Sequence, residues 1–301
     1  LSRFAVSIAV GLFPAVLVLL QDLGTALVFV PITIVMVYIG GARTRHVLLF
    51  VSATGLGLFL LVFPFLREVT QGQNDWVVRF FADGSLTLAV FAALAAAAGL
   101  SFLGVAFLKR AVFMPLAWIS VTAAAGLLLA IGAREVLQSH QIMRLIVFVD
   151  PYIDPQGAGW NVIQSLNAVG SGGLAGKGFL QGTQSQLQFL PQQSTDFIFS
   201  IIAEEWGFLG VSLVFGLFSL LLLRIVRIGM RSSDRLGAVL CAGVGAYLFF
   251  HLAVNVGMAS GVMPVMGIPL VFVSYGGSSA WASLSAVGIV LSVRRNRSIY
   301  S

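Results

Sequence analysis

The sequence is poor in charged residues and nearly devoid of cysteine. Of its 301 residues only 9% are charged, and Cys241 is the single cysteine. Soluble domains are about a quarter charged, so this chain could not cover its own surface with polar groups in water. One cysteine also excludes a disulfide framework and a cysteine-based metal cluster. We identify no cofactor, although a divalent cation stays open.

Hydrophobic residues dominate instead, at 58% of the chain with a mean hydropathy of +1.00. A membrane span needs about 20 apolar residues, and backbone groups in lipid must be satisfied within the segment, which favours helices. We therefore expect an all-α polytopic membrane protein with about eight transmembrane helices. The candidate spans are 4–20, 23–40, 47–66, 86–108, 111–132, 197–223, 236–258 and 268–293. The first two are separated by Gln21 and Asp22 alone, so they form either a tight hairpin or one broken helix.

The basic residues predict the orientation of these spans. The net charge of +6 indicates membrane topology rather than nucleic-acid binding, because the basic residues flank the apolar runs. With a cytoplasmic N-terminus, 12 of the 17 Lys and Arg residues lie inside: Arg3, Arg43, Arg45, Lys109, Arg110, Arg224, Arg227, Arg231, Arg235, Arg294, Arg295 and Arg297. The positive-inside rule then predicts that 133–196 is a long extracytoplasmic loop.

The stretch from Gly157 to Gly207 is the longest weakly apolar segment of the chain. Glycines surround Lys177, and backbone of this kind can direct several N–H groups at a phosphate. Lys177 and Arg144 are therefore candidate phosphate ligands, and the alternative is that both are ordinary solvated loop charges. Amides and hydroxyls follow the glycines, among them Gln184.

Three acids lie in the last part of this stretch. An ionisable group inside a span costs about 2.5–3.5 kcal/mol and usually faces a protein interior or cavity. Asp196, at the beginning of an apolar run, is either a catalytic residue or a carboxylate at a helix N-terminus, where the helix dipole favours its charge. Glu204 projects nearer the face of Asp196, with inter-helix hydrogen bonding as its default role, and Glu205 projects from roughly the opposite side.

Two further polar sites accompany them. Asp22 is expected to act as the N-cap of the second helix. His251 and Asn255 are spaced to share one helical face, and His251 is expected to make a structural polar contact rather than to bind metal. Pro264 and Pro269 then break regular helix, and irregular backbone at membrane depth must be buried or line a cavity.

Three motifs in order resemble the SEDS family of cell-wall glycosyltransferases. They are DLGTALV at 22–28, the run from GWNVIQSLNAVGSGG at 159 through QQSTDFIFSIIAEEWG, and HLAVNVGMASGVMPVMGIPLVFVSYGGSS at 251–279. The segment GTQSQLQFLP resembles sequences of the RodA elongation branch more than those of the FtsW division branch.

The resemblance implies a polymerase of glycan strands. Its substrate would be lipid II, the undecaprenyl-pyrophosphate disaccharide pentapeptide, at the outer face of the bacterial plasma membrane. A class B penicillin-binding protein would supply the transpeptidase. Asp196 would be the general base on the acceptor hydroxyl. The substrate-binding candidates are Lys177, Arg144, Gln184, Ser274 and Ser278, and the structural or cavity residues are Asp22, Glu204, Glu205, His251 and Asn255. Alternatives are a lipid-linked precursor transporter (flippase), an FtsW-like division polymerase, and a scaffold that activates a partner polymerase.

The sequence also departs from the family pattern. The proline that usually precedes the D-L-G-T motif is absent, Gln192-Gln193-Ser194 replaces the usual Glu-x-His, and Val271 replaces a proline. We expect 1–301 to form a single SEDS-like membrane domain that lacks the four N-terminal spans usual in the family. Residues 67–139 are expected to be an inserted helix pair.

Overall fold

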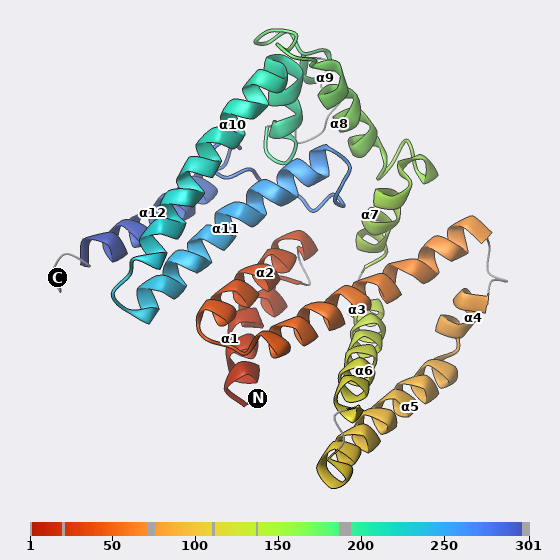
Figure 1. Ribbon diagram of the computed structural model, residues 1–301. Coiled ribbons are helices and arrows are strands. Elements are labelled where there is room, and N and C mark those ends of the chain that lie inside the picture. Colours follow the sequence, from red (N-terminus) through yellow and green to blue (C-terminus); the bar gives the residue numbers. More distant parts are fainter. Residues whose placement is uncertain are drawn as a thin grey trace. The chain divides into compact units, whose positions relative to one another are not determined.

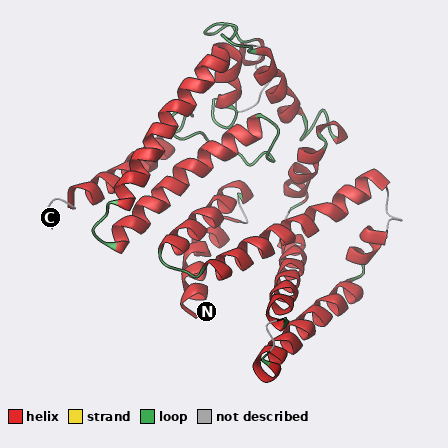
Figure 2. Ribbon diagram, viewed as in Figure 1, coloured by secondary structure: helices red, strands yellow, loops and turns green. Residues whose placement is uncertain are grey.

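The computed structural model describes residues 2–19, 22–71, 76–109, 112–136, 138–186 and 194–296. All regular secondary structure in these ranges is helical (Figures 1 and 2). The chain divides into two compact units, one made of residues 1–42 and 143–301 and the other of residues 43–142. Helix α7, Ser139–Val149, runs from the second into the first.

The unit of residues 43–142 is a small helical bundle. Its elements are α3 (Thr44–Gln71), α4 (Trp76–Ala82), α5 (Gly84–Leu103) with a π-helical turn (Gly104–Leu108), and α6 (Phe113–Val136). Helix α6 packs against both α3 and α5. A Cβ atom on Gly57 would lie 3.1 Å from the Gly126 carbonyl oxygen, so small residues set the close approach of α3 and α6.

The other unit is built around α11. It contains α1 (Ser2–Leu19), α2 (Leu23–Ile39), a 3₁₀ turn (Pro151–Ile153), α8 (Trp160–Ser171), α9 (Thr183–Gln186), α10 (Ile198–Met230), α11 (Arg235–Ala259) and α12 (Gly277–Asn296). Helix α11 packs against α2, α8, α10 and α12. Its Leu248 and Met258 are fully buried, which makes α11 the apolar centre of this unit.

Among the described residues, five helices are long and apolar enough to cross a membrane. They are Thr44–Glu68, Gly84–Leu108, Phe113–Glu135, Ile198–Met230 and Arg235–Ala259. Two shorter apolar helices, Phe4–Leu19 and Gly24–Ile39, pack against each other, so the hairpin is correct and the single broken helix is wrong. The chain is a multi-pass membrane protein, as its composition predicted.

One predicted boundary is wrong. The last span was expected over 268–293, but α12 begins only at Gly277, because the preceding segment is non-helical and Gly267 has φ +67°. The segment 133–196, predicted to be a long extracytoplasmic loop, holds the end of α6 together with α7, α8 and α9, and its side of the membrane stays a prediction.

Helix α10 is interrupted at Gly207, where φ is 60° and ψ is −158°. In an unbroken helix each N–H donates to the carbonyl four residues earlier. Here the N–H groups beyond the break donate elsewhere, from Phe208 to the Gly173 oxygen at 2.9 Å and from Leu209 to the Leu174 oxygen at 3.1 Å. The glycine-rich loop of residues 172–182 thus accepts two hydrogen bonds from N–H groups that would otherwise donate within the helix.

The same loop satisfies the helix carbonyls released by the break. The Lys177 N–H donates to the Glu204 carbonyl at 2.9 Å, and the Gly178 N–H donates to the Glu205 carbonyl at 3.0 Å. Loop and helix therefore exchange hydrogen bonds in both directions. The exchange gives two N–H groups and two carbonyls of α10 partners in the loop, as buried backbone groups need.

The exchange needs glycine on both sides of the contact. A Cβ atom at Gly176 would lie 2.1 Å from the Glu205 carbonyl oxygen, and one at Gly172 would lie 1.8 Å from the Ala203 carbonyl oxygen. A Cβ atom at Gly207 would lie 2.3 Å from the Gly176 nitrogen. The glycines predicted to serve a phosphate thus have a packing role against α10.

We expect Gly207→Ala to destabilise the protein, because only glycine adopts this backbone conformation freely and a side chain would clash with the loop. Such strain costs about 1–3 kcal/mol. The measurement is the thermal unfolding midpoint of the detergent-solubilised protein. Gly216→Ala in the same helix is the matched control, since a Cβ atom there meets nothing within 4 Å. Equal midpoints for the two variants would contradict the hydrogen-bond exchange.

Candidate active site

Asp196 lies in the turn that leads into α10, and the segment before α12 holds this turn by hydrogen bonds. The Tyr275 N–H donates to the Ser194 carbonyl at 2.9 Å, and the Ser274 hydroxyl donates to the Thr195 carbonyl at 2.6 Å. The Ser274 oxygen in turn accepts the Leu270 N–H at 2.7 Å. The irregular segment before α12 therefore anchors the turn that carries the acid.

Asn255 completes this anchor from α11. Its fully buried side-chain amide donates to the Asp196 carbonyl and to the Ile268 carbonyl, both at 2.8 Å. The carbonyls of three successive residues, Ser194 to Asp196, are thus held by α11 and by the segment before α12. The position of the Asp196 carboxyl is set by a rigid backbone rather than by a free loop.

The surroundings of Asp196 raise the pKa of its carboxyl above the ordinary value of 3.8, chiefly because burial disfavours the charged form. A hydrogen bond from Thr195 and the positive charge of Arg144 oppose the rise, while the negative charge of Asp22 adds to it. The structure therefore brings Arg144 and Asp22 into the electrostatic environment of Asp196. A carboxylate with a raised pKa is a stronger base than an ordinary surface aspartate.

Two other polar residues have the structural roles that the sequence predicted. Asp22 is the N-cap of α2, accepting the Gly24 N–H at 2.9 Å and the Thr25 hydroxyl. The His251 Nδ1–H donates to the Tyr247 carbonyl at 2.9 Å, so this ring nitrogen is not available as a metal ligand. In the described ranges, no group of three His, Cys, Asp or Glu side chains could hold a metal ion.

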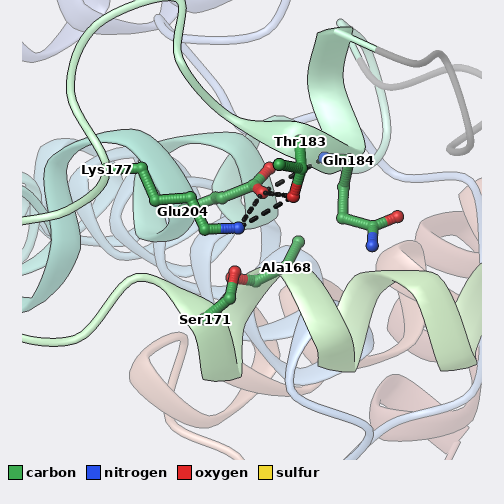
Figure 3. A network of polar contacts seen from close by, with 6 residues as sticks. All are labelled: Ala168, Ser171, Lys177, Thr183, Gln184 and Glu204. Atoms are coloured by element: carbon green, nitrogen blue, oxygen red, sulfur yellow. Dashed lines mark hydrogen bonds and ion pairs between the residues drawn. The ribbon is translucent and has the colours of Figure 1, made fainter.

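A second polar group surrounds Glu204, whose side chain is fully buried (Figure 3). Its Oε1 accepts the Lys177 ammonium at 2.7 Å, the Thr183 hydroxyl at 3.0 Å and the Gln184 backbone N–H at 3.1 Å. The Lys177 ammonium also donates to the Thr183 oxygen at 2.9 Å. Glu204 has the hydrogen-bonding role predicted for it, and Lys177, expected at a phosphate, forms an ion pair with it here.

The remaining candidates differ in their surroundings. Ser278 is exposed in the first turn of α12, and Glu205 is buried.

Sequence reasoning missed the buried junction of α8, α10 and α11. There the Ser165 hydroxyl lies 2.6 Å from the Ser200 hydroxyl and donates to the Ala259 carbonyl at 2.9 Å. Single serines in apolar helices gave no signal that could have found this junction.

We expect Lys177→Met to destabilise the protein by about 3–5 kcal/mol if Glu204 stays charged, because a buried carboxylate then loses its cation. The double variant Lys177→Met/Glu204→Gln should recover most of that loss, because it removes both charges. Thermal unfolding of the two variants and of wild type measures the difference. Equal destabilisation of the single and double variants would show that the ion pair is not what stabilises this loop.

Comparison with known proteins agrees with the motifs. Residues 85–299 match the model of the FtsW, RodA and SpoVE family, described as cell cycle proteins. The peptidoglycan glycosyltransferase RodA of Treponema pallidum is 44% identical over 97% of this chain and 68% of its own length. The peptidoglycan glycosyltransferase MrdB of Escherichia coli K12 is 38% identical over 82% of this chain and 62% of its own length.

The solved structures include a similar chain. A chain from a peptidoglycan synthase complex that coordinates polymerization and crosslinking is 25% identical over 98% of this chain and 89% of its own, with a TM-score of 0.48. The sequence match covers most of the residues described above, including both polar groups. The chain therefore belongs to the FtsW/RodA/SpoVE family of cell cycle proteins, the SEDS family that its motifs resemble.

Proposed function

We propose that this chain is a peptidoglycan glycosyltransferase that polymerises lipid II into glycan strands for cell elongation and shape. The observation that carries the proposal is its 44% identity, over 97% of its length, to a peptidoglycan glycosyltransferase RodA. The chain spans 68% of that relative and 62% of the Escherichia coli one. The polymerase is favoured over the transporter, because both relatives are named as glycosyltransferases.

In this proposal Asp196 acts as the general base. Its carboxylate takes the proton from the acceptor sugar hydroxyl as that oxygen bonds to the anomeric carbon of the donor. The bond from that carbon to the pyrophosphate oxygen breaks, and undecaprenyl pyrophosphate leaves with the bonding electrons. A positioned base contributes about 10²–10⁴-fold to such a step. The rigid anchor of the turn and the raised pKa of the Asp196 carboxyl support this role.

The leaving pyrophosphate needs positive charge. Arg144 is the better candidate for it, since its side chain is exposed and its charge acts on Asp196. Lys177 would have to exchange its ion pair with Glu204 for the substrate. We keep Gln184, Ser274 and Ser278 as proposed substrate contacts, although the hydroxyl of Ser274 already donates to the Thr195 carbonyl.

We further propose that the protein lies in the bacterial plasma membrane with residues 133–196 on the extracytoplasmic side. The excess of Lys and Arg in the opposite loops supports this orientation. Lipid II and a class B penicillin-binding protein are the proposed substrate and partner, and the family resemblance supports both. That residues 67–139 are an insertion into a SEDS-like domain also stays a prediction.

We expect Asp196→Asn to abolish polymerisation of purified lipid II while leaving expression and membrane insertion intact, because an amide cannot accept the hydroxyl proton. The product is measured on gels with the protein in detergent, together with its penicillin-binding partner. Asp150→Asn is the matched control, because Asp150 is an exposed cap whose side chain accepts the Tyr152 N–H at 2.9 Å, a bond that asparagine preserves.

Two outcomes of this assay would count against the proposal. Substantial polymer from Asp196→Asn would remove Asp196 as the base. No polymer from wild type or from Asp150→Asn would contradict the claim that these 301 residues carry the activity. Labelled lipid II that crosses vesicle membranes without forming polymer would favour the transporter instead.

The charges around Asp196 predict opposite shifts in the pH profile. The base works only when it is deprotonated, so activity falls as pH drops through its pKa. Arg144→Gln removes a charge that lowers this pKa, so the acid limb of kcat/KM should move to higher pH. Asp22→Asn removes a charge that raises it, so the limb should move to lower pH, and asparagine still caps α2. Shifts in the same direction would contradict the assignment of this limb to Asp196.

A further inference from the structure

Four arginines converge on one pocket at the ends of α10 and α12. Arg224, Arg227 and Arg231 come from the last turns of α10 and its C-cap, and Arg294 comes from the last turn of α12. Spacings of three and four residues place the first three on one face of the helix. The pocket has a volume of about 140 Å³. A site that holds one water needs only about 10–15 Å³, so a phosphate-sized group fits.

These charges are not neutralised by the protein. Within the described ranges, none of the four arginines forms an ion pair, and no carboxylate lines the pocket. The nearest acid in sequence, Asp234, caps α11, accepting the Gly237 N–H at 3.0 Å and the Ser232 hydroxyl at 3.1 Å. Like charges at these spacings repel one another. The pocket therefore carries an unmatched positive charge that a bound anion would relieve.

The length of α10 is consistent with a pocket at the depth of lipid headgroups. From Phe208, just after the break in α10, the helix rises about 24 Å to Arg224 and about 35 Å to Arg231 at 1.5 Å per residue. The hydrocarbon core of a bilayer is about 30 Å thick. A bilayer with one boundary at the break would therefore have its other boundary between Arg224 and Arg231, at the end of α10 opposite to Asp196.

Apolar surface continues from the pocket toward the membrane centre. Leu220, Leu223 and Val226 on α10 and Leu291 on α12 are all at least half exposed, at 62%, 50%, 51% and 54%. Arginines at the boundary with apolar side chains beside them match an amphiphile that carries a phosphate on acyl chains. A soluble phosphate would use only the first of these two features.

We propose that this pocket binds the phosphate headgroup of an anionic phospholipid in the leaflet where α10 and α12 end. Guanidinium groups pair with phosphate oxygens in bidentate geometry, and basic pockets between transmembrane helices bind anionic lipid headgroups. The lipid would hold the ends of α10 and α12 together by screening their mutual repulsion. This site is separate from Asp196 and independent of the polymerase proposal.

The test compares two double variants that each remove two positive charges. Arg227→Gln/Arg231→Gln alters the pocket, and Arg43→Gln/Arg45→Gln alters exposed arginines elsewhere. Native mass spectrometry of the detergent-solubilised protein, titrated with phosphatidylglycerol or phosphatidylcholine, reports bound lipid. We expect wild type to prefer phosphatidylglycerol. The pocket variant should bind it roughly ten- to thirty-fold more weakly, and the control should stay close to wild type.

Four results would overturn the proposal. Equal losses in both double variants would show diffuse surface attraction, and unchanged binding in the pocket variant would exclude the pocket. Displacement of the lipid by excess inorganic phosphate would assign the site to a soluble anion. Thermal unfolding in phosphatidylcholine checks that the pocket variant is folded. Arg227→Lys/Arg231→Lys keeps both charges and should retain most of the preference for phosphatidylglycerol. If this Lys variant lost the preference as completely as the Gln variant, a charge-based site would be excluded.

Discussion

Backbone hydrogen bonding where helices are interrupted is the constraint on which this structure depends. Where a helix breaks off in the packed interior of the protein, its freed N–H and carbonyl groups need partners within the protein. The break at Gly207 meets this demand by exchanging bonds with the loop before α9. The turn at Asp196 meets it through Asn255 and Ser274. Both irregular segments are held by hydrogen bonds to neighbouring elements, so polar side chains can be presented at defined positions.

The two polar groups share α10 and differ in character. Asp196, in the turn that leads into the helix, has a half-buried carboxyl whose pKa is raised. Glu204 lies two turns further along, fully buried and bonded to Lys177, Thr183 and Gln184. The proposed base is partly exposed, and the other acid bonds the glycine-rich loop to α10. A single helix thus connects the turn that carries Asp196 with the loop that carries Lys177.

Much of the fold and part of the site could be predicted from sequence. Long apolar runs fixed the helices of both units, and the cap at Asp22 followed from its position before Leu23-Gly24-Thr25. The start of α12 could not be predicted, because it depends on bonds from Ser274 and Tyr275 to a turn about 80 residues away. The glycines around Lys177 looked like a phosphate loop, and their contact with a break in α10 was invisible without the tertiary structure.

The exchange at Gly207 also has a consequence for motion. Amides in surface loops usually open by local fluctuations, and core helices open only in larger cooperative units. Here the Lys177 and Gly178 amides donate to helix carbonyls, and the Phe208 and Leu209 amides donate to loop carbonyls. Loop and helix therefore open together, and amide hydrogen exchange would report one protection level for all four. In its dynamics, the glycine-rich loop is a part of α10.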